Sequence, residues 1–116
     1  MSNRLLRVNE LLQREISSFL RKRYTSESVG TTITGVEITG DLREAKVFFS
    51  VLGGAAEAEK TGLWLLRKRN EIREMLAKNV VIRHVPLLAF IHDDHAPRTL
   101  RVETLLGEID QETKSS

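Results

Sequence analysis

The chain of 116 residues contains no cysteine and only two prolines, and aromatic residues make up 5% of it. The absence of cysteine excludes a disulfide framework and thiolate metal ligands, and it suits a reducing compartment. No apolar run approaches the roughly 20 residues of a membrane-spanning helix. Charges recur every few residues at the N-terminus, so the apolar core of a secretory signal is also missing. We therefore expect a cytoplasmic protein without a membrane partner.

The length and composition are those of a single globular domain. A chain of 116 residues can bury one modest core, and 41% hydrophobic with 29% charged residues is an ordinary composition for such a core and its surface. No internal repeat or linker interrupts the chain. We expect one domain over residues 1–110, followed by a polar tail over residues 111–116.

Positive charge is concentrated in two blocks, although the formal net charge is only +2. Residues 1–23 carry six basic and two acidic side chains, and residues 60–84 carry seven basic and two acidic ones. Residues 24–59 and 85–116 are acidic in balance. If the fold brings the basic blocks together, they form the basic face typical of a nucleic-acid binder. The alternative is two separate, solvated helix faces.

Residues 3–23 have the pattern of an amphipathic helix. Apolar residues recur every three or four positions, which places them on one stripe at 3.6 residues per turn. Arg7, Arg14 and Arg21 recur every seven residues and form a cationic column beside that stripe. The apolar positions are Leu5, Val8, Leu12, Ile16 and Phe19.

Two strands are expected next, over residues 31–40 and 45–52. In the second strand, Ala45, Val47 and Phe49 occupy alternate positions and give one face to a core. The dipeptide Gly40–Asp41 predicts a tight turn and therefore an antiparallel hairpin. Gly35 predicts a bulge within the first strand.

A second helical region is expected to have two arms, residues 55–66 and 71–79. The segment Arg67–Asn70 lies between them and contains three adjacent cations. Asparagine tolerates the left-handed backbone conformation, so we expect a break near Asn70. An unbroken helix is the alternative.

The C-terminal part predicts a strand and a short helix. The strand covers residues 80–93 and is bent at Pro86, because proline cannot donate a hydrogen bond to a sheet. Pro97 can begin the helix. The apolar positions of that helix are Val102, Leu105, Leu106 and Ile109.

The sequence His-Asp-Asp-His at residues 92–95 contains the side-chain types that bind transition metals. In an extended chain His92 and His95 point to opposite faces, and the only other histidine, His84, lies beyond Pro86. We interpret the segment as the end of a strand rather than a metal site or a small metal-dependent enzyme. Phosphate-binding glycine motifs and a nucleophile elbow are also absent. We expect no cofactor, no small-molecule substrate and no catalysis.

The predicted order of elements is helix, strand, strand, helix, break, helix, strand. This is the order of a type II KH domain, an α+β fold in which three helices pack on one face of a three-stranded sheet. In KH domains the turn between two helices approaches a nucleic-acid backbone. The usual GXXG sequence of that turn lets phosphates come close to main-chain N–H groups, and this chain has no such motif.

Four segments carry a resemblance to the bacterial ribosome-binding factor A family. They are RVNELLQREISSFL (7–20), TTITGVEITGDLREAKVFFSVL (31–52), IREMLAKNVVIRHVPLLAFIHDD (72–94) and RVETLL (101–106). The resemblance implies a cytoplasmic assembly factor that binds the free small ribosomal subunit and its 16S rRNA. It also implies a role in maturing the 5′ end of 16S rRNA and in growth in the cold, without catalysis. We expect a monomer.

The expected RNA contacts are cations on the first helix and around the break, because such side chains neutralise phosphates without reading sequence. Base stacking is expected to be minor, with Tyr24 as a candidate, while Trp64 packs inside. The expected contacts are Arg4, Arg7, Arg14, Arg21, Lys22, Arg23, Arg67, Lys68, Arg69, Asn70, Arg73, Lys78 and Arg83.

Two segments depart from the family pattern. Members usually have Ala-x-Gly at the turn between the helices, where this chain has Lys68, Arg69 and Asn70, and the loop 25–29 lacks the common Asp-Pro-Arg-like stretch. An alternative function is a small protein-interaction domain that presents an acidic face to a basic partner. The acidic residues are Glu37, Asp41, Glu44, Glu57 and Glu59.

Overall fold

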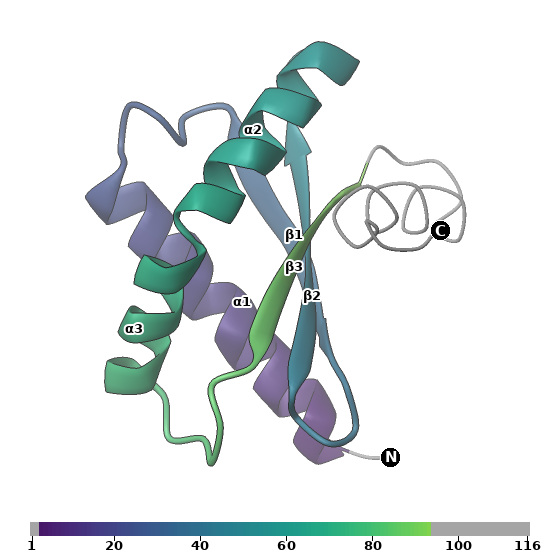
Figure 1. Ribbon diagram of the computed structural model, residues 1–116, viewed down its shortest axis with the longest axis vertical. Helices are drawn as coiled ribbons and strands as arrows, with labels where there is room; N and C mark the ends of the chain where they lie inside the picture. The colour runs from purple at the N-terminus through teal and green to yellow at the C-terminus, as the bar shows by residue number, and fades with distance from the viewer. Residues whose placement is uncertain (1–2, 94–116) are drawn as a thin grey trace.

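The structure is a computed structural model that describes residues 3–93. Within these residues the chain forms three helices and a three-stranded sheet (Figure 1). The order of elements confirms the predicted α+β, KH-like fold. The last helix expected after Pro97, and the tail, lie outside the described residues. The elements are α1 (Asn3–Arg23), β1 (Thr31–Ile38), β2 (Glu44–Val51), α2 (Ala55–Arg67), α3 (Arg69–Asn79) and β3 (Leu87–His92).

The sheet has the order β1-β2-β3, with β1 and β2 antiparallel and β2 and β3 parallel. Its register shifts between Ile33 and Gly35, which confirms the predicted bulge. The hairpin connection is longer than the predicted two-residue turn and spans residues 39–43. Leu42, not Gly40, adopts positive φ (64°). Asp41 stabilises the connection by accepting hydrogen bonds from the Thr39 hydroxyl (2.6 Å) and the Arg43 N–H (3.1 Å).

One hydrophobic core joins all three helices to the same face of the sheet. Leu12 and Ile16 of α1 are fully buried together with Leu65 of α2 and Ile72 of α3. They meet alternate strand residues, such as Phe49, as the strand periodicity predicts. The expectation that the first helix and the broken helix pair share one side of the sheet is therefore confirmed.

The helix α1 also protects one edge of the sheet, the edge formed by β1. An edge strand has unpaired main-chain groups that invite association with other strands. Asn9 accepts a hydrogen bond from the Ile38 N–H (2.9 Å), and Gln13 donates one to the Ile33 carbonyl (3.1 Å). These polar side chains flank the apolar stripe of α1, so the same helix covers the core and fixes its own position along β1.

The third strand is shorter than predicted and begins after Pro86. Residues 80–86 are not part of the sheet, because proline cannot donate to a ladder. Arg73 of α3 holds this non-strand segment: its Nε donates to the Pro86 carbonyl (2.9 Å) and an Nη donates to the Val85 carbonyl (2.8 Å). The strand then ends at His92, as expected for the histidine-containing segment.

The adjacent glycines before α2 have different conformational requirements, and this difference is testable. Gly53 has φ +121°, and a Cβ there would lie 2.8 Å from Cγ of Glu57. Gly54 is the N-cap of α2, has φ −100°, and has open space around it. We expect Gly53→Ser to lower the free energy of unfolding by about 1–3 kcal/mol. Gly54→Ser should raise it by about a few tenths of a kcal/mol, because serine caps helices better than glycine.

Urea denaturation of the two variants measures both effects. Equal midpoints for Gly53→Ser and Gly54→Ser would contradict the assigned backbone conformations.

Candidate nucleic-acid interface

The two basic blocks meet where the C-terminal end of α1 lies against the first turn of α3. The contact is made by the carboxylate of Glu71. The Arg23 Nε donates to Glu71 Oε2 at 2.7 Å, and the Tyr24 hydroxyl donates to Glu71 Oε1. We call this contact and the cations around it the junction; its cations are Arg21, Lys22, Arg23, Arg67, Lys68 and Arg69.

Tyr24 links the junction to the second helix. Its ring packs edge-on against Trp64, with 5.2 Å between ring centroids, and against Phe19 at 6.2 Å. The Lys68 ammonium lies 4.9 Å from the centre of the same ring, within range of a cation–π interaction. Tyr24 is therefore half-buried at the centre of a helix–helix contact rather than displayed for base stacking. Trp64 is partly buried and packs against the hydrophobic core, which agrees with the expectation that it packs.

The electrostatics of the junction keep Glu71 ionised. The hydrogen bond from Tyr24, followed by that from Arg23, holds the pKa of the Glu71 carboxyl below its usual value. The same hydrogen bond, together with burial, raises the pKa of the Tyr24 hydroxyl. Glu71 also raises the pKa of Arg23, first through their hydrogen bond. One carboxylate therefore neutralises one cation of the junction and leaves the others in excess.

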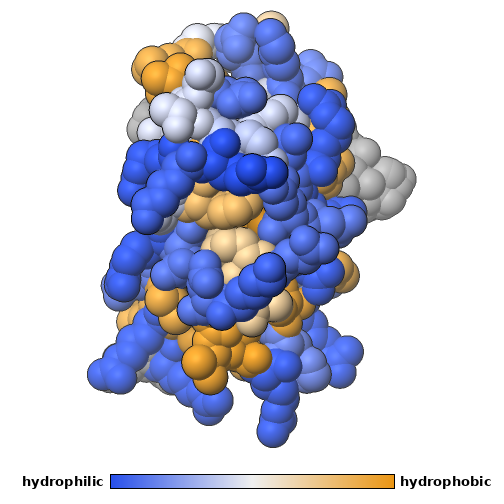
Figure 2. Space-filling model, turned by 90° about the vertical axis from the view of Figure 1, so that its left-hand side faces the viewer, coloured by the Kyte–Doolittle hydropathy of each residue, from blue (hydrophilic) through white to orange (hydrophobic). Residues whose placement is uncertain are grey.

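The remaining cations of the junction face solvent. Arg21, Lys22 and Arg67 are exposed, and Lys68 and Arg69 are half-exposed. No ion pair within residues 3–93 involves any of them. The side of the molecule that carries α3 and the C-terminal end of α1 is mostly hydrophilic, with smaller apolar areas between (Figure 2). The junction thus presents unpaired positive charge on a surface suited to an anionic partner.

The break between the helices falls at Lys68, not at Asn70. Lys68 has φ −91° and ψ 2°, a conformation open to residues other than glycine, and its N–H is shared between the Trp64 and Leu65 carbonyls. Among the described residues only Leu42 and Gly53 have positive φ, so the expectation of a left-handed Asn70 was wrong. Asn70 lies exposed in the first turn of α3, which has no side-chain cap.

The other predicted contacts lie away from the junction. Arg4, Arg7 and Arg14 are exposed along α1, and Arg4 is about 25 Å from Arg21 at 1.5 Å per residue. Lys78 and Arg83 are exposed at and beyond the far end of α3. Two donors of the Arg73 guanidinium already bind main-chain carbonyls, which gives that residue a role in the fold.

Sequence reasoning did not identify Glu71 or the packing role of Tyr24. Both belong to contacts between residues 47 and 48 positions apart in the chain, and no local pattern encodes such a contact. The only available signal was an acidic residue within a strongly basic block. An acidic residue in such a block lies near several Lys and Arg side chains, so it is a candidate for an ion pair with one of these cations.

The acidic residues of the alternative function are divided between two ends of the sheet. Glu37, Asp41 and Glu44 lie in or beside the connection before β2, whereas Glu57 lies in the first turn of α2, after β2. The eight residues of β2 span roughly 25 Å between these groups. The described residues therefore do not gather the acidic side chains into one face.

Metal-binding and membrane-spanning features are absent from residues 3–93. They contain no group of three His, Asp or Glu side chains placed to hold a metal ion. The His92 ring, at the end of β3, lies 5.7 Å from the Phe49 ring; Asp94 and His95 lie outside the described residues. No helix in this part of the chain is both long and apolar enough to cross a membrane.

Comparisons with known proteins agree on one family. The family model described as ribosome-binding factor A matches residues 4–106. A ribosome-binding factor A from Opitutus terrae is 42% identical over 113 residues, covering 97% of this chain and 93% of that protein. One from Akkermansia muciniphila is 36% identical over 115 residues, covering 96% and 88%.

Solved structures show the same fold at lower sequence identity. The crystal structure of ribosome-binding factor A from Thermus thermophilus has a TM-score of 0.65 at 19% identity, covering 74% of this chain and 92% of that one. Coordinates of the Thermus thermophilus factor fitted into a cryo-EM map of a 30S–RbfA complex have a TM-score of 0.61, also at 19% identity, covering 76% and 93%.

The lowered pKa of Glu71 predicts a pH-dependent contribution to stability. A carboxylate whose pKa is depressed by folding stabilises the fold above its unfolded pKa, about 4.3 for glutamate, and this contribution is lost as the pH falls below that value. We expect Glu71→Gln to be less stable than the wild type at pH 7 and the difference to shrink toward pH 3.

Denaturant midpoints at several pH values test this expectation. Glu74→Gln is the matched control, since Glu74 is exposed in the same helix and has no hydrogen bond or ion pair within the described residues. A stability difference for Glu71→Gln that stays constant with pH would refute the assigned role of the carboxylate.

Proposed function

Because the chain belongs to the ribosome-binding factor A family, we propose that it is an assembly factor that binds the free small ribosomal subunit through 16S rRNA. More specifically, it assists maturation of the 5′ end of 16S rRNA and supports growth in the cold. It acts in the cytoplasm as a monomer and catalyses no reaction. The observation that carries this proposal is the junction, where both basic blocks of the sequence meet on one surface.

The junction suits an RNA backbone because all of its cations other than Arg23 are exposed or half-exposed and have no acidic partner within the described residues. Each Lys or Arg that contacts a phosphate releases condensed counterions, and this supplies affinity without reading the sequence. Arg21 and Lys22 lie in the last turn of α1, whereas Arg67 ends α2 and Arg69 begins α3, on either side of the break. The half-buried Tyr24 contacts Trp64, Lys68 and Glu71, so it fixes the end of α1 relative to the turn between α2 and α3.

The exposed arginines of α1 extend this surface. Arg4, Arg7 and Arg14 continue from Arg21 along the helix over roughly 25 Å. An elongated row of cations can contact several phosphates of a folded RNA, whose shape rather than sequence would then be recognised. We assign Lys78 and Arg83 to the periphery of the same surface. We omit Arg73, because it holds the segment before β3.

Charge reversal at the junction tests the proposal. We expect Arg67→Glu combined with Arg69→Glu to weaken binding to free small subunits about tenfold or more at low salt. The slope of log affinity against log salt should fall in magnitude by roughly 1.4–1.8 units, because two phosphate contacts are lost. Folding should persist, since neither residue is buried or ion-paired within the described residues. Sedimentation with subunits at several salt concentrations measures both quantities.

The matched control reverses two exposed acidic residues of the neighbouring helix, Glu57→Lys and Glu59→Lys. Binding should be unchanged or slightly stronger. If this control abolishes binding while the junction variant binds normally, the protein-interaction alternative is correct.

A further inference from the structure

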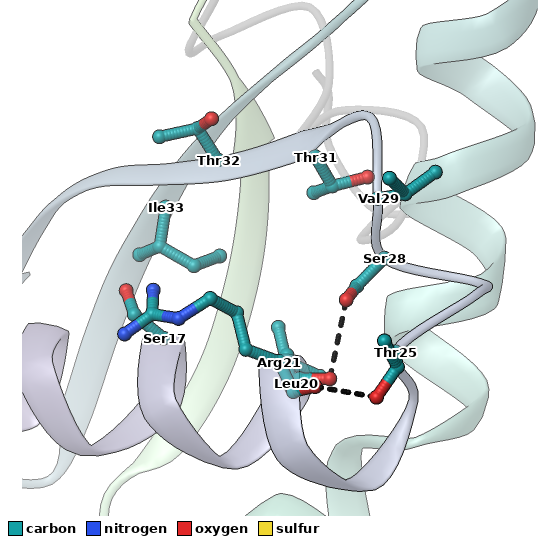
Figure 3. Close-up of a pocket in the computed structure, with 9 residues that line it drawn as sticks. All are labelled: Ser17, Leu20, Arg21, Thr25, Ser28, Val29, Thr31, Thr32 and Ile33. Carbon is teal, nitrogen blue, oxygen red and sulfur yellow. Dashed lines mark hydrogen bonds between the residues drawn. The ribbon is translucent and has the colours of Figure 1, made fainter.

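A hollow of about 410 Å³ lies beside the junction, between the C-terminal half of α1, the loop 24–30 and β1 (Figure 3). Leu20 and Ile33, which are 3% and 5% exposed, are the most deeply buried apolar residues of its lining. Arg21 lies along its α1 side, and the hydroxyl-bearing Thr31 and Thr32 come from β1. The hollow has the volume of a small-ligand site, and its walls are partly apolar and partly polar.

Two hydroxyls of the lining are already committed to the fold. The Thr25 hydroxyl donates to the Arg21 carbonyl (2.9 Å), and the Ser28 hydroxyl donates to the Leu20 carbonyl (3.1 Å), as Figure 3 shows. The Thr25 hydroxyl supplies a partner for the Arg21 carbonyl in the last turn of α1, and the Leu20 carbonyl accepts the Ser28 bond in addition to one from the Tyr24 N–H (2.9 Å). These bonds also hold the loop 24–30 over the helix end, so the hollow has fixed walls.

The other polar groups of the lining have no partner within residues 3–93. These groups are the hydroxyls of Ser17 and Thr31 and the guanidinium of Arg21, whereas the Thr32 side chain points to the other side of β1 (Figure 3). No Asp or Glu lines the hollow, so an anionic ligand would meet one cation and no repelling charge. The lining therefore offers an apolar surface, several hydroxyls that donate or accept, and a positive charge at the rim.

We infer that this hollow accepts a single unpaired nucleotide of the bound RNA. The base would cover Leu20 and Ile33, the ribose hydroxyl would meet a threonine hydroxyl, and Arg21 would contact the phosphate. Arg21, which lines the hollow, is exposed near the C-terminal end of α1, and so is Lys22, so an RNA strand bound to these two cations would lie next to the hollow. The inference rests on the proposed function and adds a preference for RNA with an extruded base.

A pair of RNA duplexes tests the inference: one fully paired, and one identical except for a single bulged nucleotide. We expect the wild type to bind the bulged duplex about fivefold more tightly, at the lower end of what burying one base contributes. Ser17→Met places a larger side chain in the hollow without changing charge and should remove this preference, leaving both duplexes bound with the affinity of the paired one.

Ser18→Met is the matched control, because Ser18 is the same residue type in the same helix but does not line the hollow. It should keep the preference. Thr31→Val removes one hydroxyl of the lining with little effect on packing and should reduce the preference, which gives a second test if Ser17→Met lowers the melting temperature.

The outcomes separate this inference from the proposed function. Equal binding of both duplexes by the wild type, or a preference that survives in Ser17→Met, overturns the nucleotide site while salt-dependent RNA binding still supports the interface. No salt-dependent binding to either duplex overturns both.

Discussion

The junction depends on a single carboxylate, that of Glu71. The C-terminal end of a helix favours cations and the N-terminal end favours anions. Arg21, Lys22 and Arg23 are therefore well placed at the end of α1, whereas Arg69 at the start of α3 is not. Glu71 supplies the negative charge that the start of α3 requires. Because it also receives hydrogen bonds from Arg23 and Tyr24, it brings two mutually repelling basic segments together and fixes their relative position.

The cations of the described chain have divided roles that their spacing in sequence does not reveal. Arg23 forms an ion pair with Glu71, and Arg73 donates hydrogen bonds to the main-chain carbonyls of the segment before β3. The Lys68 ammonium lies over the Tyr24 ring. These side chains maintain the surface on which the unpaired cations are displayed. Some of the cations of the two basic blocks therefore stabilise the fold. The positive charge available to an anionic partner is smaller than the number of Lys and Arg residues in the two blocks suggests.

Local periodicity was sufficient to predict the order of elements, the apolar stripe of α1 and the bulge at Gly35. These features follow from residues within a few positions of each other, where helix and strand repeats constrain the chain. The position of the break was not predictable, because Lys68 adopts a conformation open to most residues and carries no sequence signature. The predicted two-residue hairpin turn failed for a related reason: Asp41 stabilises a wider connection through side-chain hydrogen bonds.

The conformation of Lys68 also bears on how the interface can recognise RNA. A glycine-containing turn lets phosphate approach main-chain N–H groups closely, which fixes its position. Here the turn carries long, flexible side chains at Arg67, Lys68 and Arg69, and its backbone has no positive φ. Side-chain cations hold phosphates less rigidly than a main-chain cradle does. In the proposed interface, positional selectivity therefore comes from a site outside the turn, and the hollow lined by Arg21 has the fixed walls that such a site requires.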